Sequence, residues 1–205
     1  MHDEWVAAWH RAPDADVPDL MHAGPLEASE DEALESGWGD LVVRQHRANF
    51  DLWHIEDEAR APGASAVEIA EVKRGVDRTN QLRNDLAERL DRALLKWLAP
   101  RNLPRADAPL NSESPGLMID RLSILALKIW HTREEVERTD AAKGHAERNR
   151  DRLTLLEEQR ADLAGCLDAL WGETLAGTRR FKLYRQLKMY NDPDLNPAIY
   201  GKKGR

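Results

Sequence analysis

The sequence lacks the features that would place a protein in a membrane or in an oxidising compartment. Its one cysteine, Cys166, can form no intramolecular disulfide and no cysteine-rich metal site. No apolar run approaches the roughly 20 residues of a membrane-spanning helix. The chain begins Met1-His2-Asp3-Glu4, without the basic start and apolar core of a signal peptide. These absences predict a cytoplasmic protein with no membrane partner.

The chain also lacks an excess of positive charge. Its 30 Lys and Arg residues are outnumbered by 37 Asp and Glu, which gives a net charge of -7 at pH 7. A field of this sign repels polyanions, so we do not expect nucleic acid as a partner. The 205 residues are 41% hydrophobic and 33% charged, a balance typical of one folded helical domain with a charged exterior and not of a disordered chain.

The spacing of apolar residues predicts four long helices. The first covers 40–60, and the second covers 65–99 with an S-x-x-E capping box at Ser65. The third begins at Ser114-Pro115 and is apolar nearly all round, which predicts a central position. The fourth follows a turn at Gly144. We therefore predict an all-α fold, a bundle of four long helices in which the third and fourth form a long helical hairpin arm.

The flanking segments differ from the bundle in composition. Residues 1–36 are rich in Pro, Asp and Glu and are predicted to form an irregular N-terminal segment. Within it, Trp5 and Trp9 share one helical face, and we expect this stretch to dock on the bundle rather than on a partner. The helical bundle domain is expected over 37–200, and 201–205 are expected to form a disordered tail.

Polar residues lie beside the apolar stripes of the first three predicted helices, where a plain bundle needs none. A charged side chain is rarely buried unless it is paired. We therefore expect Arg121 and Lys128, seven residues apart on the third helix, to meet carboxylates of the first two helices. The ligand-binding candidates are His54, Asp57, Asp77, Asn80, Arg83, Asn84, Asp120, Arg121 and Lys128.

Two interpretations of these polar residues stay open. They form buried ion pairs and hydrogen bonds that fix the register of the helices, or they line a cavity between helices, where bundles usually build their sites. The number of polar residues favours a site. The absence of a recognised catalytic spacing favours structural pairs.

Carboxylates on the first two helices offer a second kind of site. Glu56, Asp57, Glu88 and Asp91 could hold Mg²⁺ at a pyrophosphate, as paired acidic turns do in all-α nucleotide pyrophosphohydrolases. The E-x-x-D spacing recurs by chance in an acidic chain, so a solvated face is the favoured interpretation. No E-x-x-H with matching partners is present, which argues against a di-iron bundle. The leading interpretation therefore includes no cofactor, with Mg²⁺ as the alternative.

For three further features, a structural role is favoured over a functional one. His131 ends the apolar part of the third helix, and a hydrogen-bonded boundary residue is favoured there over a proton-transfer group. Cys166 is expected to be a small core residue of the fourth helix. The basic segment 179–188 is expected to dock on the acidic helices of its own chain, although its arginines could also hold a phosphate.

Three blocks of the sequence resemble the bacterial DUF4254 family: LWHIEDEAR at 52–60, DRTNQLRND at 77–85 and NSESPGLMIDRLSIL at 111–125. The tail KMYNDP at 188–193 also fits, so the resemblance covers roughly residues 40–200. It implies a helical bacterial protein whose relatives often occur near glycosyltransferase genes for surface polysaccharide. The family carries no assigned activity, so the resemblance supplies no catalytic residues.

Three functions follow as hypotheses. The leading one is a binding or accessory protein for a small anionic ligand, such as a phosphorylated sugar or nucleotide, linked to surface polysaccharide biosynthesis. The first alternative is a Mg²⁺-dependent all-α phosphohydrolase. The second is a purely structural protein that forms a homodimer through the arm of helices three and four. Whether the protein is an enzyme stays open.

Overall fold

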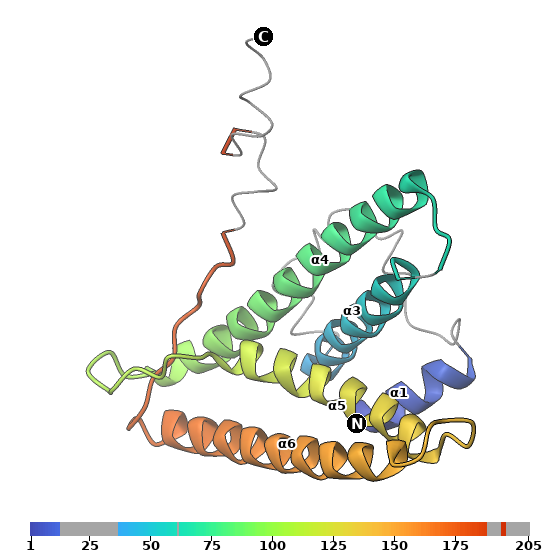
Figure 1. Ribbon diagram of the computed structural model, residues 1–205. Helices are drawn as coiled ribbons and strands as arrows, with labels where there is room; N and C mark the ends of the chain where they lie inside the picture. The colour runs from blue at the N-terminus through green and yellow to red at the C-terminus, as the bar shows by residue number, and fades with distance from the viewer. Residues whose placement is uncertain (13–36, 61, 188–193, 196–205) are drawn as a thin grey trace.

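The computed structural model describes residues 1–12, 37–60, 62–187 and 194–195, and this part of the chain is built from helices (Figure 1). The helices are α1 (His2–Arg11), α3 (Trp38–Glu58), α4 (Ala66–Leu98), the short 3-10 helix η1 (Ala99–Arg101), α5 (Pro115–Glu137) and α6 (His145–Leu175). The only strand-like pairing in the described part is an isolated bridge between Leu110 and Arg180. The all-α prediction is confirmed.

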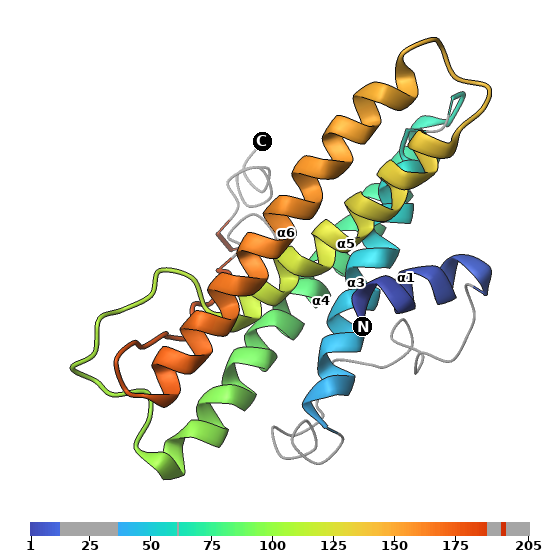
Figure 2. The same ribbon diagram turned by 90° about the horizontal axis from the view of Figure 1, so that it is seen from below.

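Two antiparallel helical hairpins, α3–α4 and α5–α6, pack against each other (Figures 1 and 2). Helix α5 is the middle element, because it contacts α6 on one side and α3 and α4 on the other. Short α1 lies against α3 and α5. The hairpin arm and the central place of the third predicted helix are therefore confirmed. None of the described helices is long and apolar enough to cross a membrane.

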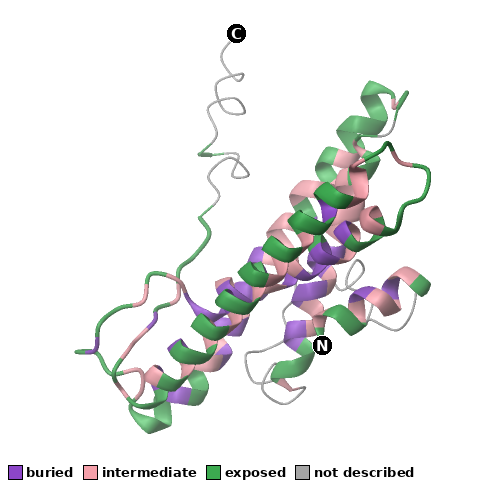
Figure 3. Ribbon diagram, turned by 60° about the horizontal axis from the view of Figure 1, so that its bottom comes forward, coloured by how far each residue is buried: buried purple, intermediate pink, exposed green. Residues whose placement is uncertain are grey.

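The apolar core follows α5 and the helix faces turned toward it (Figure 3). Burial of apolar area is the main favourable term in folding, at about 25 cal/mol per Å². One cluster joins α3, α4 and α5, and another joins α5 to α6. The first comprises Leu41, Val42, Ala48, Leu86, Leu90 and Ile119; the second comprises Met118, Leu163 and Leu170.

Local signals in the sequence set most helix ends. Ser65 and Glu68 form the predicted reciprocal capping box, which satisfies two backbone N–H groups at the start of α4. Gly144 takes the left-handed conformation, φ 81°, in the turn before α6. Helix α3 begins at Trp38, two residues earlier than the Asp40 start that the sequence predicts.

The N-terminal stretch is a helix that docks on the bundle, as the tryptophan spacing predicts. Val6 and Trp9 of α1 are fully buried, and the Trp9 ring lies beside the rings of His46 and Phe50. Residues 2–11 are thus not irregular. The rest of the predicted irregular segment, residues 13–36, and the predicted tail 201–205 lie outside the described residues.

The apolar stripe of α4 is buried over its central part only. Leu86 and Leu90 are fully buried, whereas Ile69 is 45% exposed and Trp97 is 42% exposed. At 33 residues, α4 is longer than its partner α3, which has 21. Because a helix rises about 1.5 Å per residue, the ends of α4 extend past the helices that cover its middle.

The start of α5 is fixed on α4 by a buried carboxylate. Asp91 accepts a hydrogen bond from the Ser114 hydroxyl and another from the backbone N–H of Gly116, at 2.7 Å. A carboxylate is favourable there because the first N–H groups of a helix are unpaired and carry partial positive charge. Gly116 allows the approach, since a Cβ atom at this position would lie 2.2 Å from the carbonyl oxygen of Ala87.

The contact between α4 and α5 predicts that Gly116→Ala destabilises the fold by about 2 kcal/mol or more, because the backbones must separate to admit the methyl group. Urea unfolding measures the change. Gly165→Ala in α6 is the matched control, since a Cβ there meets nothing within 4 Å. The control is expected to gain up to about 1 kcal/mol from helix propensity. Equal stability of the two variants would contradict the close approach.

A second prediction concerns pH. Burial raises the pKa of Asp91 from 3.8 to about 6, although hydrogen bonds from Ser114 and Gly116 oppose the rise. The folded state therefore keeps this proton to higher pH than the unfolded state does. The contribution of Asp91 to the free energy of unfolding therefore falls as pH rises from about 4 to about 6, by at most about 3 kcal/mol.

Asp91→Asn removes this titration, while the amide can still accept from Gly116 and donate to the Ser114 hydroxyl. As pH rises from 4 to 6, the free energy of unfolding of Asp91→Asn is expected to increase relative to that of the wild type. Urea unfolding at a series of pH values measures it, and other titrating groups cancel in the difference. A difference that stays constant with pH would refute the assignment.

Candidate functional site

Asp120 of α5 is the centre of a buried polar network. Its Oδ1 accepts hydrogen bonds from the Gln45 amide at 2.5 Å and the Asn49 amide at 3.0 Å, both from α3. The guanidinium Nε of Arg83, from α4, lies 3.4 Å from the same oxygen. Burial raises the pKa of Asp120, while Arg83 and the two amides lower it. Groups from two helices, α3 and α4, thus surround one carboxylate of α5.

The network continues from α5 to α1 through neutral groups. The Asn49 amide also donates to the Ser123 hydroxyl at 2.9 Å, and His46 Nδ1 lies 2.7 Å from that hydroxyl. Burial lowers the pKa of His46 to about 3, so its imidazole is neutral at pH 7. Its Nε2 lies 3.1 Å from the carbonyl oxygen of His2 and must donate there. His46 Nδ1 therefore accepts a hydrogen bond from the Ser123 hydroxyl. The donor and the acceptor are thus assigned for each hydrogen bond from Asn49 through Ser123 and His46 to His2.

A pocket of about 510 Å³ opens beside the network, between α3, α4 and α5. Arg83 belongs to both, so the ion pair with Asp120 lies at the edge of the pocket. We call it the Trp53 pocket. Its lining comprises Asn49, Leu52, Trp53, Glu56, Asp57, Arg60, Arg83, Ile124 and Leu127.

The Trp53 pocket combines apolar walls with a few charged groups, the usual make-up of a small-molecule site. The Arg83 Nε is buried without a hydrogen-bond partner in the described part of the chain. Arg60 lies at the exposed end of α3, where it hydrogen-bonds the Glu56 backbone and side chain. Such an arrangement can hold an anionic group near the guanidinium groups and polar groups near the carboxylates.

Of the predicted ligand-binding residues, the Trp53 pocket contains only Asp57 and Arg83, with Asp120 directly behind Arg83. Three others lie elsewhere on α4. Asp77 pairs with Lys73 one turn away. Asn80 is half-buried, and Asn84 is buried.

The expectation for Arg121 and Lys128 was wrong. Both are exposed, and they line a second pocket of about 750 Å³ on the opposite side of α5, facing α6. We call this the α5/α6 pocket. Arg121 pairs with Glu113 at 2.7 Å, not with a carboxylate of α3 or α4. Cys166 lines the same pocket and is exposed, so its predicted core position was also wrong. It lies one residue off the Leu163–Leu170 stripe that packs on α5.

The four carboxylates of the Mg²⁺ alternative do not form a group of ligands. Glu56 pairs with Arg60, and Glu88 pairs with Arg92. Both oxygens of Asp91 bind the start of α5. Within the described ranges, the one set of three or more potential ligands that comes together consists of histidines.

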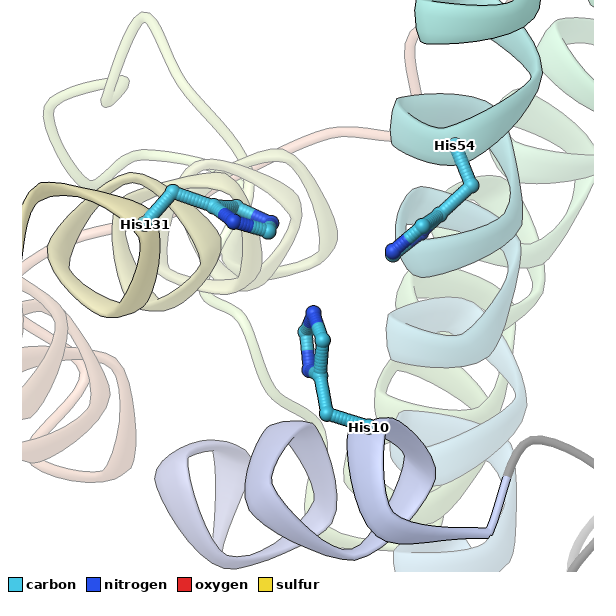
Figure 4. A group of neighbouring side chains, drawn as sticks. All are labelled: His10, His54 and His131. Atoms are coloured by element: carbon cyan, nitrogen blue, oxygen red, sulfur yellow. The ribbon is translucent and has the colours of Figure 1, made fainter. Parts of the chain in front are cut away.

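These histidines are His10, His54 and His131, from α1, α3 and α5, and we call them the histidine cluster. One ligand nitrogen from each lies within 4.8 Å of the other two. Figure 4 shows the three imidazole rings turned toward a common space. The structure thus places His54 in this cluster and not in the Trp53 pocket.

Aromatic rings surround the histidine cluster. Trp53 stacks on His131 with ring centres 4.8 Å apart, and Trp130 stacks on His10 at 5.0 Å. Phe50 lies 4.2 Å from the His54 ring. Burial lowers the pKa of His131, against the Glu134 carboxylate, which raises it. The cluster is therefore half-buried among apolar surfaces.

Sequence reasoning missed His10, Gln45 and His46. Gln45, His46 and Asn49 share a helix face at spacings of one and four among apolar residues of α3, which was the available signal. No local pattern marks His10, because its partners lie on helices far along the chain. The basic segment contacts its own chain only in part: Arg179 pairs with Glu173 and Phe181 is buried, whereas Lys182 and Arg185 are exposed. Residues 188–190 lie outside the described part.

Comparison with known proteins assigns the chain to a family. No curated protein and no solved structure matches it. A family model described as "Protein of unknown function (DUF4254)" matches residues 39–183, which include α3, α4, α5 and α6. The match covers both pockets and two members of the histidine cluster, but not His10. Because the match spans most of the sequence, the chain belongs to the DUF4254 family.

Proposed function

We propose that the protein binds a small anionic molecule in the Trp53 pocket and acts as a binding or accessory protein. The observation that carries the proposal is Arg83, which forms an ion pair with the buried Asp120 through its Nε and also lines the Trp53 pocket. Asp120 holds this guanidinium in place from behind. A cation that the fold already holds in place loses little entropy when an anion binds.

The walls of the Trp53 pocket favour a phosphorylated sugar or nucleotide over a bare anion. Arg83 and Arg60 can contact a phosphate, since guanidinium groups bind phosphate through two parallel hydrogen bonds. The Trp53 ring offers a flat face for a sugar or base. Glu56 and Asp57 can accept hydrogen bonds from hydroxyl groups. A link to surface polysaccharide biosynthesis is part of the proposal, and it rests only on what the family resemblance implies.

The two rival functions have less support. A Mg²⁺-dependent phosphohydrolase needs carboxylates that converge, and Asp91 is instead bound to the start of α5. A purely structural protein needs no pocket with a guanidinium group held at its wall. A homodimer through the α5–α6 arm is compatible with ligand binding, because the Trp53 pocket lies on the other side of α5.

The proposal predicts that a screen of sugar phosphates and nucleotides includes compounds that raise the Tm of the wild type. Arg83→Met is expected to weaken binding of such a compound by about 10- to 100-fold, the value of a charge-assisted hydrogen bond. Arg60→Met, at an exposed position, is expected to weaken it without affecting the fold. Isothermal titration calorimetry measures each affinity, and a titration with MgCl₂ alone is expected to show no uptake.

Arg121→Met is the matched control, because it removes a guanidinium from the α5/α6 pocket and leaves the Trp53 pocket intact. It is expected to bind as the wild type does. Loss of binding in this variant would place the ligand in the α5/α6 pocket. If no anionic compound shifts Tm at millimolar concentration, the proposed function is wrong.

A further inference from the structure

The histidine cluster holds three lone pairs that face one another. His10 Nδ1 lies 2.8 Å from the carbonyl oxygen of Val6, and His54 Nδ1 lies 2.8 Å from that of Phe50. A carbonyl oxygen can only accept a hydrogen bond, so both Nδ1 atoms carry the proton. In a neutral imidazole, the Nε2 atom then carries the lone pair. Two of the three rings are thus fixed as Nδ1–H tautomers by their own helices.

The third ring has the same tautomer for a related reason. His131 Nδ1 lies 2.8 Å from a carboxylate oxygen of Glu134, which accepts its proton. The Nε2 atoms of His10 and His131 are buried and have no hydrogen-bond partner in the described part of the chain. Buried polar atoms without partners are rare and costly in proteins. A cation between the rings would satisfy them.

We propose that His10, His54 and His131 bind one divalent transition-metal ion through their Nε2 atoms, with Zn²⁺ as the best match. Imidazole nitrogens favour Zn²⁺, Co²⁺ and Ni²⁺, whereas Mg²⁺ and Ca²⁺ prefer oxygen ligands. Three protein ligands leave the fourth tetrahedral position to water or another small ligand, as in catalytic zinc sites.

The spacing of the histidine cluster fits such an ion after a small movement. The three nitrogens lie within 4.8 Å of one another, so a metal ion placed between them in their plane would lie at most about 2.8 Å from each, whereas Zn–N bonds measure about 2.0–2.1 Å. Each nitrogen therefore has to move inward by at most about 0.7 Å. Small changes in the side-chain torsions supply this movement, because the rings already point into one space (Figure 4).

The surroundings of the histidine cluster match the outer shell of metal sites. Metal-binding histidines usually donate their second N–H to a backbone carbonyl or a carboxylate, which orients the ring and raises its basicity. All three histidines make such a contact, to Val6, Phe50 and Glu134. Aromatic packing alone does not require this pattern of protons. A bound ion would also join α1 to α3 and α5.

The test uses the full chain, freed of metal with a chelator and then titrated with ZnCl₂ or CoCl₂. We expect one Zn²⁺ per chain, a rise in Tm, and visible absorption of a tetrahedral Co²⁺ complex. Zn²⁺ is also expected to slow amide hydrogen exchange in α1, since His10 lies there. MgCl₂ is expected to do none of these.

Single variants assign the ligands. His10→Ala, His54→Ala and His131→Ala are each expected to lower Zn²⁺ affinity by more than about 100-fold, and Glu134→Ala by about 10-fold. His145→Gln is the control for loss of an imidazole outside the cluster, since His145 pairs with Glu135. Circular dichroism checks that each variant stays helical.

Two results would overturn the proposal: no Zn²⁺ uptake by the wild type, or unchanged uptake by the triple variant of His10, His54 and His131. The histidine cluster shares no ligand residue with the proposed anion site, although Trp53 packs on His131 and also lines the Trp53 pocket. Zn²⁺ uptake is measured without any anionic compound, and failure of one proposal leaves the other standing.

Discussion

The Asp120 carboxylate has to be neutralised inside a helix bundle, and this requirement ties the central helix to both of its neighbours on one side. Removing Arg83 would leave the carboxylate buried without an opposite charge, which costs several kcal/mol. Gln45 and Asn49 supply hydrogen bonds from α3, and Arg83 supplies the opposite charge from α4. Because hydrogen bonds fall off steeply with distance and angle, the three contacts allow one register of α3, α4 and α5. Apolar side chains alone permit several registers.

This register also determines where binding chemistry can occur. Arg83 forms the boundary between the buried network and the Trp53 pocket, so its guanidinium is held by the fold before any ligand arrives. Through Ser123 and His46 the same network reaches the backbone of His2. The docking of α1 therefore depends on polar contacts as well as on the burial of Trp9. It is this docking that brings His10 to the other two histidines.

The sequence predicted the helices well because each is marked by local signals. The capping box at Ser65, the turn at Gly144 and the Ser114-Pro115 start all act within a few residues. The candidate site was predicted only in part. Helix α5 is apolar nearly all round, so its periodicity could not tell which neighbour Arg121 and Lys128 face.

The other contacts that the sequence did not predict depend on tertiary packing. Asp91 looked like a metal ligand, but its partners are a hydroxyl and a backbone N–H that only tertiary packing brings to it. The histidine cluster joins residues 10, 54 and 131, and no local pattern encodes a contact at such separations. Ile69 lies on the apolar stripe of α4 but is exposed, since helix length and not periodicity decides its burial.

Trp53 belongs to both of the sites for which we propose ligands. Its indole lines the Trp53 pocket and also stacks on the His131 ring, nearly parallel at 10°. If both proposals hold, movement of His131 toward a metal ion shifts the surface against which Trp53 packs, and hence a wall of the pocket. Protein interiors are packed too densely to absorb such a shift locally. Metal and anion would then affect each other's affinity by the same factor, as thermodynamic linkage requires. The stacked pair of Trp53 and His131 is the contact through which that coupling would pass.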